Sequence, residues 1–434
     1  MSDYVNPRSL GSEVDVDAVV VGAGVTGIYQ LHRLREAGLR VLALEAADSI
    51  GGTWRWNRYP GCRLDSESYS YGYFFSQELW EEWNWSEHFV TQPELERYMN
   101  FVVEKFDLAP HIRLNSKVTA ASFDDEHNVW TVNVNGSEII RSRHIILATG
   151  QLSTPFEPQV KGKESFQGQM YHTFEWPADG VDLTGKRVAV MGAGSTGVQL
   201  APVIAEQVEE LIMFQRTANW CTPLNNGPIT EDEQREIKDH RERYEQLTLK
   251  SPGGFLHAPT RGEMFEDSVE ERTALFERLY AEGRGFQKIY GHYRDTSLNP
   301  EANRALGEFF ARKIRERVND PVVAEKLIPK DHGPNMKRPP METNYYEMYN
   351  RSNVKLVDLR ETPIEEITPH GVRTTEEEFE LDVIVWATGF DAITGAIKQL
   401  DLRGRDGLLL TDKWKAGMLT LWGVMVPQFP NMFI

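Results

Sequence analysis

The sequence predicts an α/β protein with two Rossmann-like domains, the second of which carries a helical insertion. Two observations indicate the domains: a G-x-G-x-x-G motif occurs twice, and each copy lies between a buried-strand pattern and a helix pattern. A third indicates the insertion, because a longer stretch follows the second copy before its unit closes, and much of that stretch shows charged helical patterns.

The first glycine motif follows a strand pattern at 16–21 and opens a helix pattern. Gly22 allows the tight turn, Gly24 lets the backbone approach a pyrophosphate, and Gly27 lets the helix lie close to the sheet. A second strand pattern ends at Glu45, 18 positions after Gly27. Because a carboxylate at this point binds ribose hydroxyls, the first unit is expected to bind FAD or NAD.

The second motif, Gly192 to Gly197, has the same context but different chemistry at the end of its second strand pattern. Gln215 occupies the position that corresponds to Glu45, and Arg216 follows it. A carboxylate would repel a ribose 2′-phosphate, whereas an arginine binds it through two hydrogen bonds. The second unit is therefore expected to bind NADP.

Both units close with an apolar strand pattern that runs into Ala-Thr-Gly. From Gly22 to Ala148 is 126 positions, and from Gly192 to Ala387 is 195, so the second unit contains an insertion. The expected domains are an FAD-binding domain at 1–150 completed by 385–434, an NADP-binding domain at 151–228 completed by 330–384, and a helical insertion at 229–329.

Composition argues against several classes of protein. A net charge of −18 argues against binding to nucleic acid or anionic membranes. No apolar run approaches the roughly 20 residues that span a bilayer, and 1–17 contain no secretory signal pattern. Cys62 and Cys221 form no C-x-x-C pair, which excludes a disulfide reductase, and the histidines lack metal-ligand spacing. We expect a cytoplasmic protein without a metal.

Three further motifs are informative. The segment 166–177 fits F-x-G-x-x-x-H-x-x-x-W-P/D; 52–65 contains Gly-Thr-Trp, Tyr-Pro-Gly and an aspartate; and 337–351 contains Lys-Arg-Pro, Asn-Tyr-Tyr and Tyr-Asn-Arg. These motifs resemble those of the type I Baeyer–Villiger monooxygenases and follow one another along the chain in the family's order, and the likeness runs from about Asp15 to Pro430. The resemblance implies an enzyme that uses FAD, NADPH and O2 to convert ketones to esters or lactones through a C4a-peroxyflavin and a tetrahedral Criegee adduct.

The resemblance also implies roles for two charged residues. Arg338 aligns with the family's catalytic arginine, a fixed cation that favours the peroxide anion and the oxyanion of the adduct. Asp65 aligns with the carboxylate that orients this arginine. At about 4 Å and an effective dielectric near 20, such a cation contributes roughly 4 kcal/mol, equivalent to about three units in the pKa of the peroxide.

The expected cofactor-binding residues come from the two glycine motifs and their neighbours. Arg216 and Lys337, with Thr217 as a hydroxyl donor, are expected to bind the 2′-phosphate of NADP. The glycine loop of the second unit adds Gly192, Gly194, Ser195, Thr196 and Gly197. The residues expected around FAD are Gly22, Gly24, Thr26, Gly27, Glu45, Gly52, Thr53, Trp54, Asp65 and Tyr71. His172 is expected on a linker between domains and outside the chemistry.

Two alternatives remain open. A flavin-dependent N- or S-oxygenase would use the same cofactors, although such proteins usually lack the Trp-Pro end of the first motif. A non-catalytic nucleotide-binding remnant is the other, because the chain ends at Ile434, where the family continues. We expect this form to bind FAD poorly or to consume NADPH without making ester. The expected partners are a small-molecule ketone and O2; no motif indicates which ketone or how many subunits.

Overall fold

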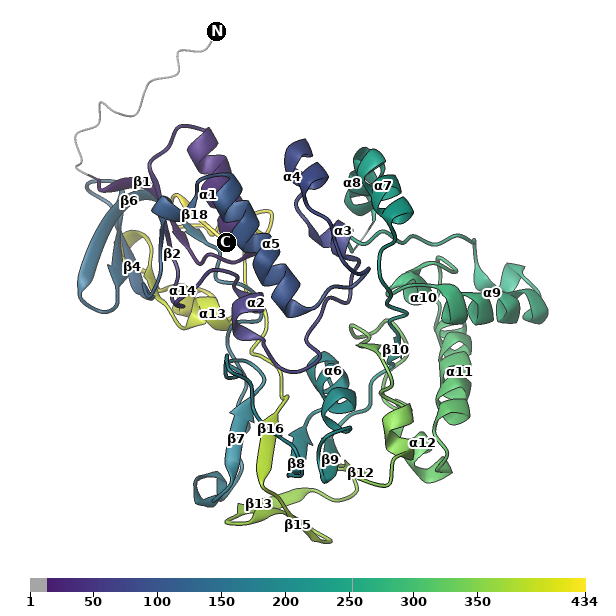
Figure 1. Ribbon diagram of the computed structural model, residues 1–434. Coiled ribbons are helices and arrows are strands. Elements are labelled where there is room, and N and C mark those ends of the chain that lie inside the picture. Colours follow the sequence, from purple (N-terminus) through teal and green to yellow (C-terminus); the bar gives the residue numbers. More distant parts are fainter. Residues whose placement is uncertain (1–13, 252) are drawn as a thin grey trace. The chain divides into compact units, whose positions relative to one another are not determined.

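The computed structural model describes residues 14–251 and 253–434, which form two compact units (Figure 1). The first unit contains the residues up to Trp56, Leu95–Phe156 and Phe390–Ile434, and the second contains Asn57–Glu94 and Glu157–Gly389. Each unit is built around a sheet with parallel neighbouring strands and a helical crossover, so the predicted fold class is confirmed. Most of the N-terminal stretch in which we expect no secretory signal, residues 1–13, lies outside the described residues.

An eight-stranded sheet forms the centre of the first unit. Its strands follow the order β17-β4-β5-β6-β1-β2-β3, with β18 paired to β6. β1 (Val16–Val21) runs parallel to β2 (Val41–Leu44) on one side and to β6 (Glu138–Leu147) on the other. α1 (Val25–Glu36) connects β1 to β2. These elements are the βαβ opening that the first glycine motif predicts, and they begin and end within three residues of the expected bounds.

The same sheet contains two antiparallel strands that the sequence analysis did not predict, whereas the end of β6 is the expected strand that runs into Ala148. β4 (Val118–Asp124), β5 (Val129–Val134) and β6 form an antiparallel meander. Asn135-Gly136 at its second turn is a common hairpin signal, and this meander could have been found from it. β17 (Asp401–Arg403) and β18 (Met432–Phe433) pair in parallel with β4 and β6. The remaining elements are α2 (Thr53–Trp56), α5 (Gln92–Lys105), η2 (Ala109–His111), β3 (Ile112–Arg113), α13 (Gly395–Lys398), η6 (Arg405–Gly407) and α14 (Leu410–Lys413).

The second unit contains a five-stranded sheet in the order β12-β9-β8-β16-β7. All of its pairings are parallel, and α6 (Ser195–Ile204) crosses from β8 to β9. His172 ends the edge strand β7 and pairs with Trp386, so the expected linker histidine belongs to the sheet. The strands are β7 (Gln169–His172), β8 (Arg187–Met191), β9 (Glu210–Gln215), β12 (Val354–Asp358) and β16 (Val383–Trp386).

A helical stretch lies between two short strands of the second unit, β10 (Thr222–Pro223) and β11 (Met341–Glu342). The charged helical pattern from Glu231 to Leu247 forms two helices, because the first one ends at its C-cap His240, a residue of low helix propensity. The helices are α7 (Glu231–Asp239), α8 (Arg241–Lys250), η4 (Met264–Glu266), α9 (Val269–Glu282), α10 (Gln287–Tyr290), α11 (Pro300–Arg317) and α12 (Pro321–Leu327). Elsewhere the unit contains α3 (Ser68–Tyr71), α4 (Gln77–Glu82), η3 (Lys163–Ser165), η5 (Glu347–Asn350), β13 (Ile364–Thr368), β14 (Gly371–Thr374) and β15 (Glu378–Glu380).

The segment 57–94 belongs to the second unit, although the expected domain boundaries placed 1–150 in one piece. Its beginning is held on α6. The Tyr59 hydroxyl donates to Gln199 Oε1 at 2.9 Å. Gly61 has a φ of +84°, and a Cβ there would lie 2.5 Å from the carbonyl oxygen of Gln199, so only glycine permits this approach. As a result Asp65 shares a unit with the second glycine motif.

A buried lysine lies in the helical stretch. Lys288 is 2% exposed, and its ammonium group donates to the carbonyl oxygen of Gly283. Burial lowers the pKa of Lys288 to about 7, although the nearby Glu342 and Glu67 act in the opposite direction. Between pH 7 and the ordinary lysine value of 10.5, the unfolded chain therefore binds more protons than the folded one. The free energy of unfolding consequently rises with pH through this window and is lowest below it.

Lys288→Met is expected to stabilise the protein at pH 7 by up to about 4 kcal/mol, because a flexible apolar side chain of similar length removes the cost of the buried charge. Urea unfolding midpoints at pH 7, 8.5 and 10 measure the effect, and the variant should show a flatter pH dependence. The exposed Lys398 gives a matched control, Lys398→Met. An unchanged slope in the Lys288 variant would contradict the assignment.

Candidate functional site

The glycine loop of the first unit lies between β1 and α1. Gly24 is the N-cap of α1 and supplies no side-chain cap, which leaves the first amides of this helix available to a phosphate. Glu45 is 5% exposed, and its carboxylate accepts hydrogen bonds from the backbone nitrogens of Ala23 at 2.7 Å and Ala47 at 2.9 Å. The carboxylate thus lies against the loop, as a ribose-binding group must.

The residues expected at 52–54 lie beside this loop. Gly52 has a φ of +54°, and a Cβ there would come within 2.9 Å of the Cα atom of Gly24. The close approach of two glycines brings the start of α2, with Thr53 exposed and Trp54 buried, next to the glycine motif. Thr26 is exposed in the first turn of α1. The expected residues of the first unit are therefore gathered around one loop.

The second unit repeats this arrangement. Gly194 is the N-cap of α6, again without a side-chain cap, and Ser195, Thr196 and Gly197 form the first turn. A Cβ built at Gly194 would meet no atom within 4 Å, so the loop is open on that side. An open loop with free amides fits a pyrophosphate.

Gln215 and Arg216, at the end of β9, have different surroundings. Gln215 is 2% exposed and donates to the carbonyl oxygen of Lys326 at 2.8 Å. Arg216 is exposed and lines a cavity of about 480 Å³. Thr217 Oγ1 accepts a hydrogen bond from Arg360 at 3.2 Å, and Arg360 lines the same cavity. Sequence analysis missed Arg360, which lies 143 positions from Thr217.

Arg338 and Asp65 form a bidentate ion pair within the second unit. Nε of Arg338 donates to Oδ2 of Asp65 at 3.0 Å, and Nη2 donates to Oδ1 at 2.8 Å. Burial works to lower the pKa of Arg338, but the hydrogen bonds and charge of Asp65 outweigh it and raise the pKa. The nearby Tyr71 phenol acts in the same direction. The structure therefore brings together three expected residues around a permanently charged guanidinium.

Two aromatic rings that the sequence analysis missed complete the surroundings of Arg338. Its guanidinium carbon lies 4.7 Å from the ring centroid of Phe286 and 5.4 Å from that of Phe255. The two rings are 4.4 Å apart. Each such contact contributes about 0.5–1 kcal/mol at a partly exposed site. Neither ring belongs to a motif, so only the folded chain indicates this contact.

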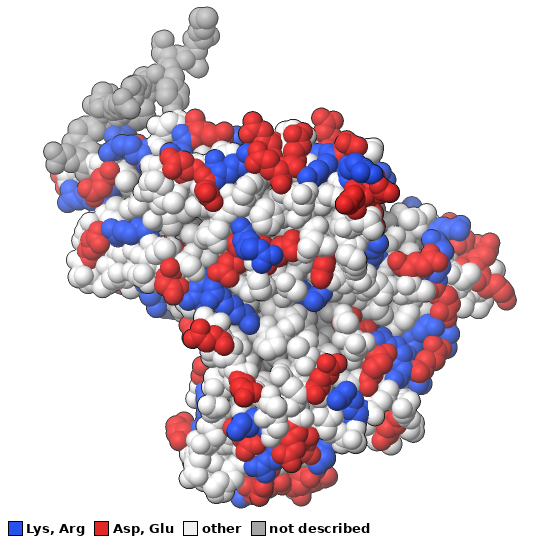
Figure 2. All heavy atoms as spheres, in the orientation of Figure 1, with Lys and Arg blue, Asp and Glu red and all other residues white. Residues whose placement is uncertain are grey.

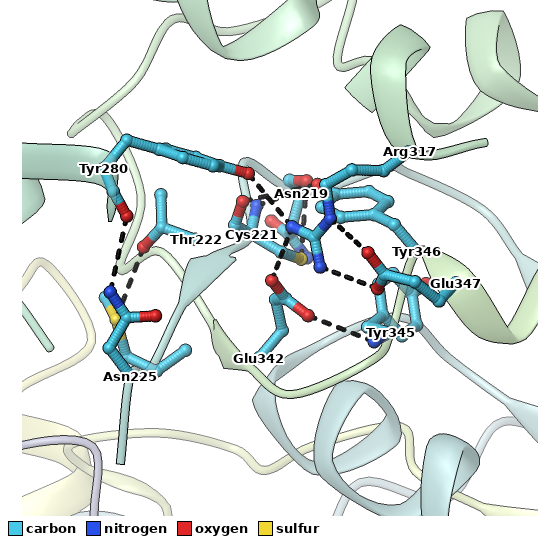
Figure 3. Close-up of polar contacts among 11 residues, drawn as sticks. Asn219, Cys221, Thr222, Asn225, Tyr280, Arg317, Glu342, Tyr345, Tyr346 and Glu347 are labelled. Atoms are coloured by element: carbon cyan, nitrogen blue, oxygen red, sulfur yellow. Dashed lines mark hydrogen bonds and ion pairs between the residues drawn. The ribbon is translucent and has the colours of Figure 1, made fainter. Parts of the chain in front are cut away.

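A buried charge cluster holds the segment that follows Arg338 (Figure 3). Arg317 at the end of α11 donates to Glu342 Oε1 at 2.7 Å, to both carboxylate oxygens of Glu347 and to the Tyr280 hydroxyl. The other oxygen of Glu342 accepts from the backbone nitrogen of Tyr345 at 3.0 Å. Burial works to lower the pKa of Arg317, but the two carboxylates raise it well above its usual range. The cluster fixes β11, which begins three residues after Arg338.

The two cysteines are unpaired and buried. Burial raises the pKa of the Cys62 thiol to about 12, and it also raises that of Cys221. Within the described ranges, no group of His, Cys, Asp and Glu side chains is arranged to hold a metal ion, and none of the helices there is long and apolar enough to cross a membrane. Figure 2 shows acidic and basic side chains interspersed over the visible face.

The sequence matches a family model described as pyridine nucleotide-disulphide oxidoreductase over residues 19–249. The match begins within β1 and ends within α8. It therefore includes both glycine loops and more than half of the chain.

Several curated proteins are similar over nearly the whole chain. The 2-oxo-Δ3-4,5,5-trimethylcyclopentenylacetyl-CoA monooxygenase of Pseudomonas putida is 48% identical over 96% of this chain and 78% of its own length. A phenazine N-monooxygenase of Lysobacter antibioticus is 41% identical over 96% and 77%. A Baeyer-Villiger monooxygenase of Pseudooceanicola batsensis is 40% identical over 99% and 78%.

Solved structures have the same fold. OTEMO in complex with FAD and NADP superimposes with a TM-score of 0.95 at 47% identity, covering 97% of this chain and 80% of that one. Cyclohexanone monooxygenase with bound ε-caprolactone superimposes with a TM-score of 0.93 at 39% identity, covering 96% and 82%. The fold is thus shared with structures that contain FAD, NADP or a lactone.

Proposed function

Since the chain belongs both to the pyridine nucleotide-disulphide oxidoreductase family and to the Baeyer–Villiger monooxygenases, we infer that it is an FAD-containing, NADPH-dependent ketone monooxygenase. It uses O2 to convert a ketone into an ester or a lactone. The structural observation that best supports this function is the bidentate Asp65–Arg338 pair, because it provides a fixed, oriented positive charge.

The glycine loops fit the two cofactors. We propose that the first loop, with Glu45 at its side, holds the pyrophosphate and ribose of FAD. We propose that Gly192 to Gly197 hold the pyrophosphate of NADPH and that Arg216, Thr217 and Lys337 hold its 2′-phosphate. When bound, FAD reduced by NADPH supplies the activated oxygen for the insertion.

We propose that Arg338 stabilises the negative charge that develops on the ketone oxygen. Its guanidinium cannot lose its proton at working pH, and its half-exposed position leaves it accessible to substrate. Asp65 fixes the plane of the guanidinium through two hydrogen bonds, and the ring of Phe286 packs against it. Orientation of a fixed charge before the reaction begins is what makes it effective.

The test is to saturate the chain with FAD, add NADPH and offer cyclic, aromatic and steroid ketones. A product with one added oxygen, seen as ester or lactone by mass spectrometry, is the expected result. NADPH consumption that yields only hydrogen peroxide with every ketone would contradict the proposal and would agree instead with the uncoupled form that the sequence analysis expects.

Asp65→Asn is expected to lower the kcat for ketone oxygenation by about 10- to 100-fold, because the amide keeps the shape of the side chain but loses one strong, charge-assisted hydrogen bond. The KM for NADPH should change less than twofold. Glu157→Gln, which breaks the exposed ion pair with Lys163, is the matched control. Equal activity of both variants would contradict a positioning role for Asp65.

A second candidate function is oxygenation of nitrogen or sulfur. It is favoured by one observation, the 41% identity to the phenazine N-monooxygenase. Trp176-Pro177 and Arg338 favour the ketone reaction. Parallel assays with a ketone, a phenazine and an aryl sulfide distinguish the two functions. Only conversion of the ketone establishes a ketone monooxygenase.

We propose a cytoplasmic location, which the two unpaired thiols support. If the proposal holds, both cysteines of protein purified without reductant react with iodoacetamide after unfolding. A mass that shows no alkylation would instead indicate oxidised thiols.

A further inference from the structure

A cavity lined by four basic and four acidic residues lies at the carboxyl ends of β9 and β12 in the second unit. Its volume is about 480 Å³, and residues of both strand ends and of α12 line it. Ligands of open α/β sheets bind at this edge, and the volume is within the usual range for small-molecule sites. Its basic lining residues are Arg216, Lys326, Lys330 and Arg360.

Most acidic side chains of this lining are already neutralised. Glu361 pairs with Lys326 at 2.7 Å, and Glu325 pairs with Lys330 at 2.8 Å. Among the described residues, no carboxylate forms an ion pair with Arg216. The cavity therefore presents Arg216 and Arg360 as its cations for a ligand.

Arg360 is held in place by only one of its three guanidinium nitrogens. Nη2 donates to Asp331 Oδ2 at 2.6 Å and to Thr217 Oγ1 at 3.2 Å. Nε and Nη1 have no hydrogen-bond partner among the residues that the structure describes. Each two-donor edge of a guanidinium includes Nη2, paired with either Nε or Nη1. A phosphate monoester, which accepts two parallel hydrogen bonds from arginine, would therefore take Nη2 from its present partner together with one of these two nitrogens.

Asp331 is the group with which a phosphate would compete. Its Oδ2 contacts Arg360, while its Oδ1 pairs with Nδ1 of His332 at 2.6 Å. The hydrogen bond with His332 lowers the pKa of Asp331, and the positive charge of Lys337 also lowers it. Asp331 would therefore keep His332 as a partner if it released Arg360, and the exchange leaves no carboxylate unpaired.

We propose that Arg360 is a further residue that selects NADPH over NADH, and that the 2′-phosphate displaces Asp331 from Arg360 when the cofactor binds. This inference rests on the proposed NADP site of the second unit. It adds Arg360 to Arg216, Thr217 and Lys337. It also gives Asp331 the role of a competing anion that lowers the affinity for the phosphate.

Calorimetric titration of the FAD-containing protein with 2′,5′-ADP and with 5′-AMP tests the proposal without turnover. Arg360→Gln should weaken binding of 2′,5′-ADP by about tenfold and binding of 5′-AMP by less than twofold, because only the former carries the phosphate that the guanidinium binds. Asp331→Asn should strengthen binding of 2′,5′-ADP by about three- to tenfold. Arg351→Gln, an exposed arginine outside the cavity, is the control.

The double variant Asp331→Asn with Arg360→Gln distinguishes two explanations: competition of Asp331 with the phosphate for Arg360, and simple repulsion between Asp331 and the phosphate. If Asp331 competes for Arg360, the gain from Asp331→Asn disappears in the Arg360→Gln background. An undiminished gain there would overturn the exchange. Arg360→Lys, with its melting temperature measured, shows whether a lost affinity reflects lost charge or lost folding, since it retains the charge.

The outcomes distinguish this inference from the function on which it rests. A wild-type protein that binds 2′,5′-ADP no more tightly than 5′-AMP contradicts the NADP site as a whole. A wild-type preference that Arg216→Gln abolishes and Arg360→Gln leaves intact overturns the role of Arg360 alone.

Discussion

Arg338→Ala is expected to lower the rate of ketone oxygenation by about three orders of magnitude. A unit charge at about 4 Å and an effective dielectric near 20 contributes roughly 4 kcal/mol, and each 1.36 kcal/mol of barrier is about tenfold in rate. NADPH should still reduce the flavin, because most of the cofactor-binding candidates lie on the glycine loops and at the end of β9, and the variant retains Lys337, Asp65 and Tyr71. The variant should therefore consume NADPH and O2 without forming ester.

Stopped-flow absorbance measures reduction of the flavin by NADPH, and mass spectrometry of the product measures ester formation. Arg338→Lys is the informative companion, because it keeps a charge but loses the fork that Asp65 holds. It should recover only part of the activity. Ester formation by Arg338→Ala within tenfold of the wild type would remove Arg338 from the catalytic assignment.

Glu342→Ala is expected to lower the free energy of unfolding by about 3–5 kcal/mol, because it removes the buried carboxylate partner of Arg317, whose own side chain is only 19% exposed. The Glu342 side chain is fully buried, whereas that of Glu347 is 44% exposed. Glu347→Gln should therefore cost less, about 1 kcal/mol. Urea unfolding followed by tryptophan fluorescence measures both variants.

A double replacement tests whether the loss comes from an uncompensated charge. Arg317→Met with Glu342→Leu removes both charges and keeps the volume, so it should restore most of the stability lost by Glu342→Ala. If the double variant is as unstable as the single one, packing rather than charge determines the loss. Since β11 follows Arg338 closely, reduced ketone turnover should accompany the single variant.

Local sequence patterns predicted the two βαβ units because the signals are local. A glycine loop, its strand and its helix occupy fewer than 30 consecutive residues, and the contrast between Glu45 and Gln215 depends only on position. The structure adds that Gln215 and Arg216 both line the cavity, where Gln215 is buried and bonded to the carbonyl oxygen of Lys326 and Arg216 is exposed. The roles of these residues toward the cofactors remain predictions.

The rest of the candidate site depends on contacts between distant parts of the chain. Asp65 and Arg338 are 273 positions apart, and only resemblance to a family paired them before the fold was known. Phe286 and Arg360 belong to no motif, and their contacts arise from how α10 and the end of β12 pack. No periodicity of charge or hydrophobicity carries such information.

The grouping of 57–94 with the second unit has a consequence for recombination between relatives. A chimera with its crossover at residue 150, the boundary that the glycine motifs suggest, would inherit Asp65 from one parent and Arg338 from the other. Exchanging 57–94 together with 157–389 keeps the salt bridge, its aromatic neighbours and the arginine-lined cavity in one inherited block. Chimeras built on those four junctions should therefore inherit their pyridine-nucleotide preference and the proposed catalytic arginine from the same parent.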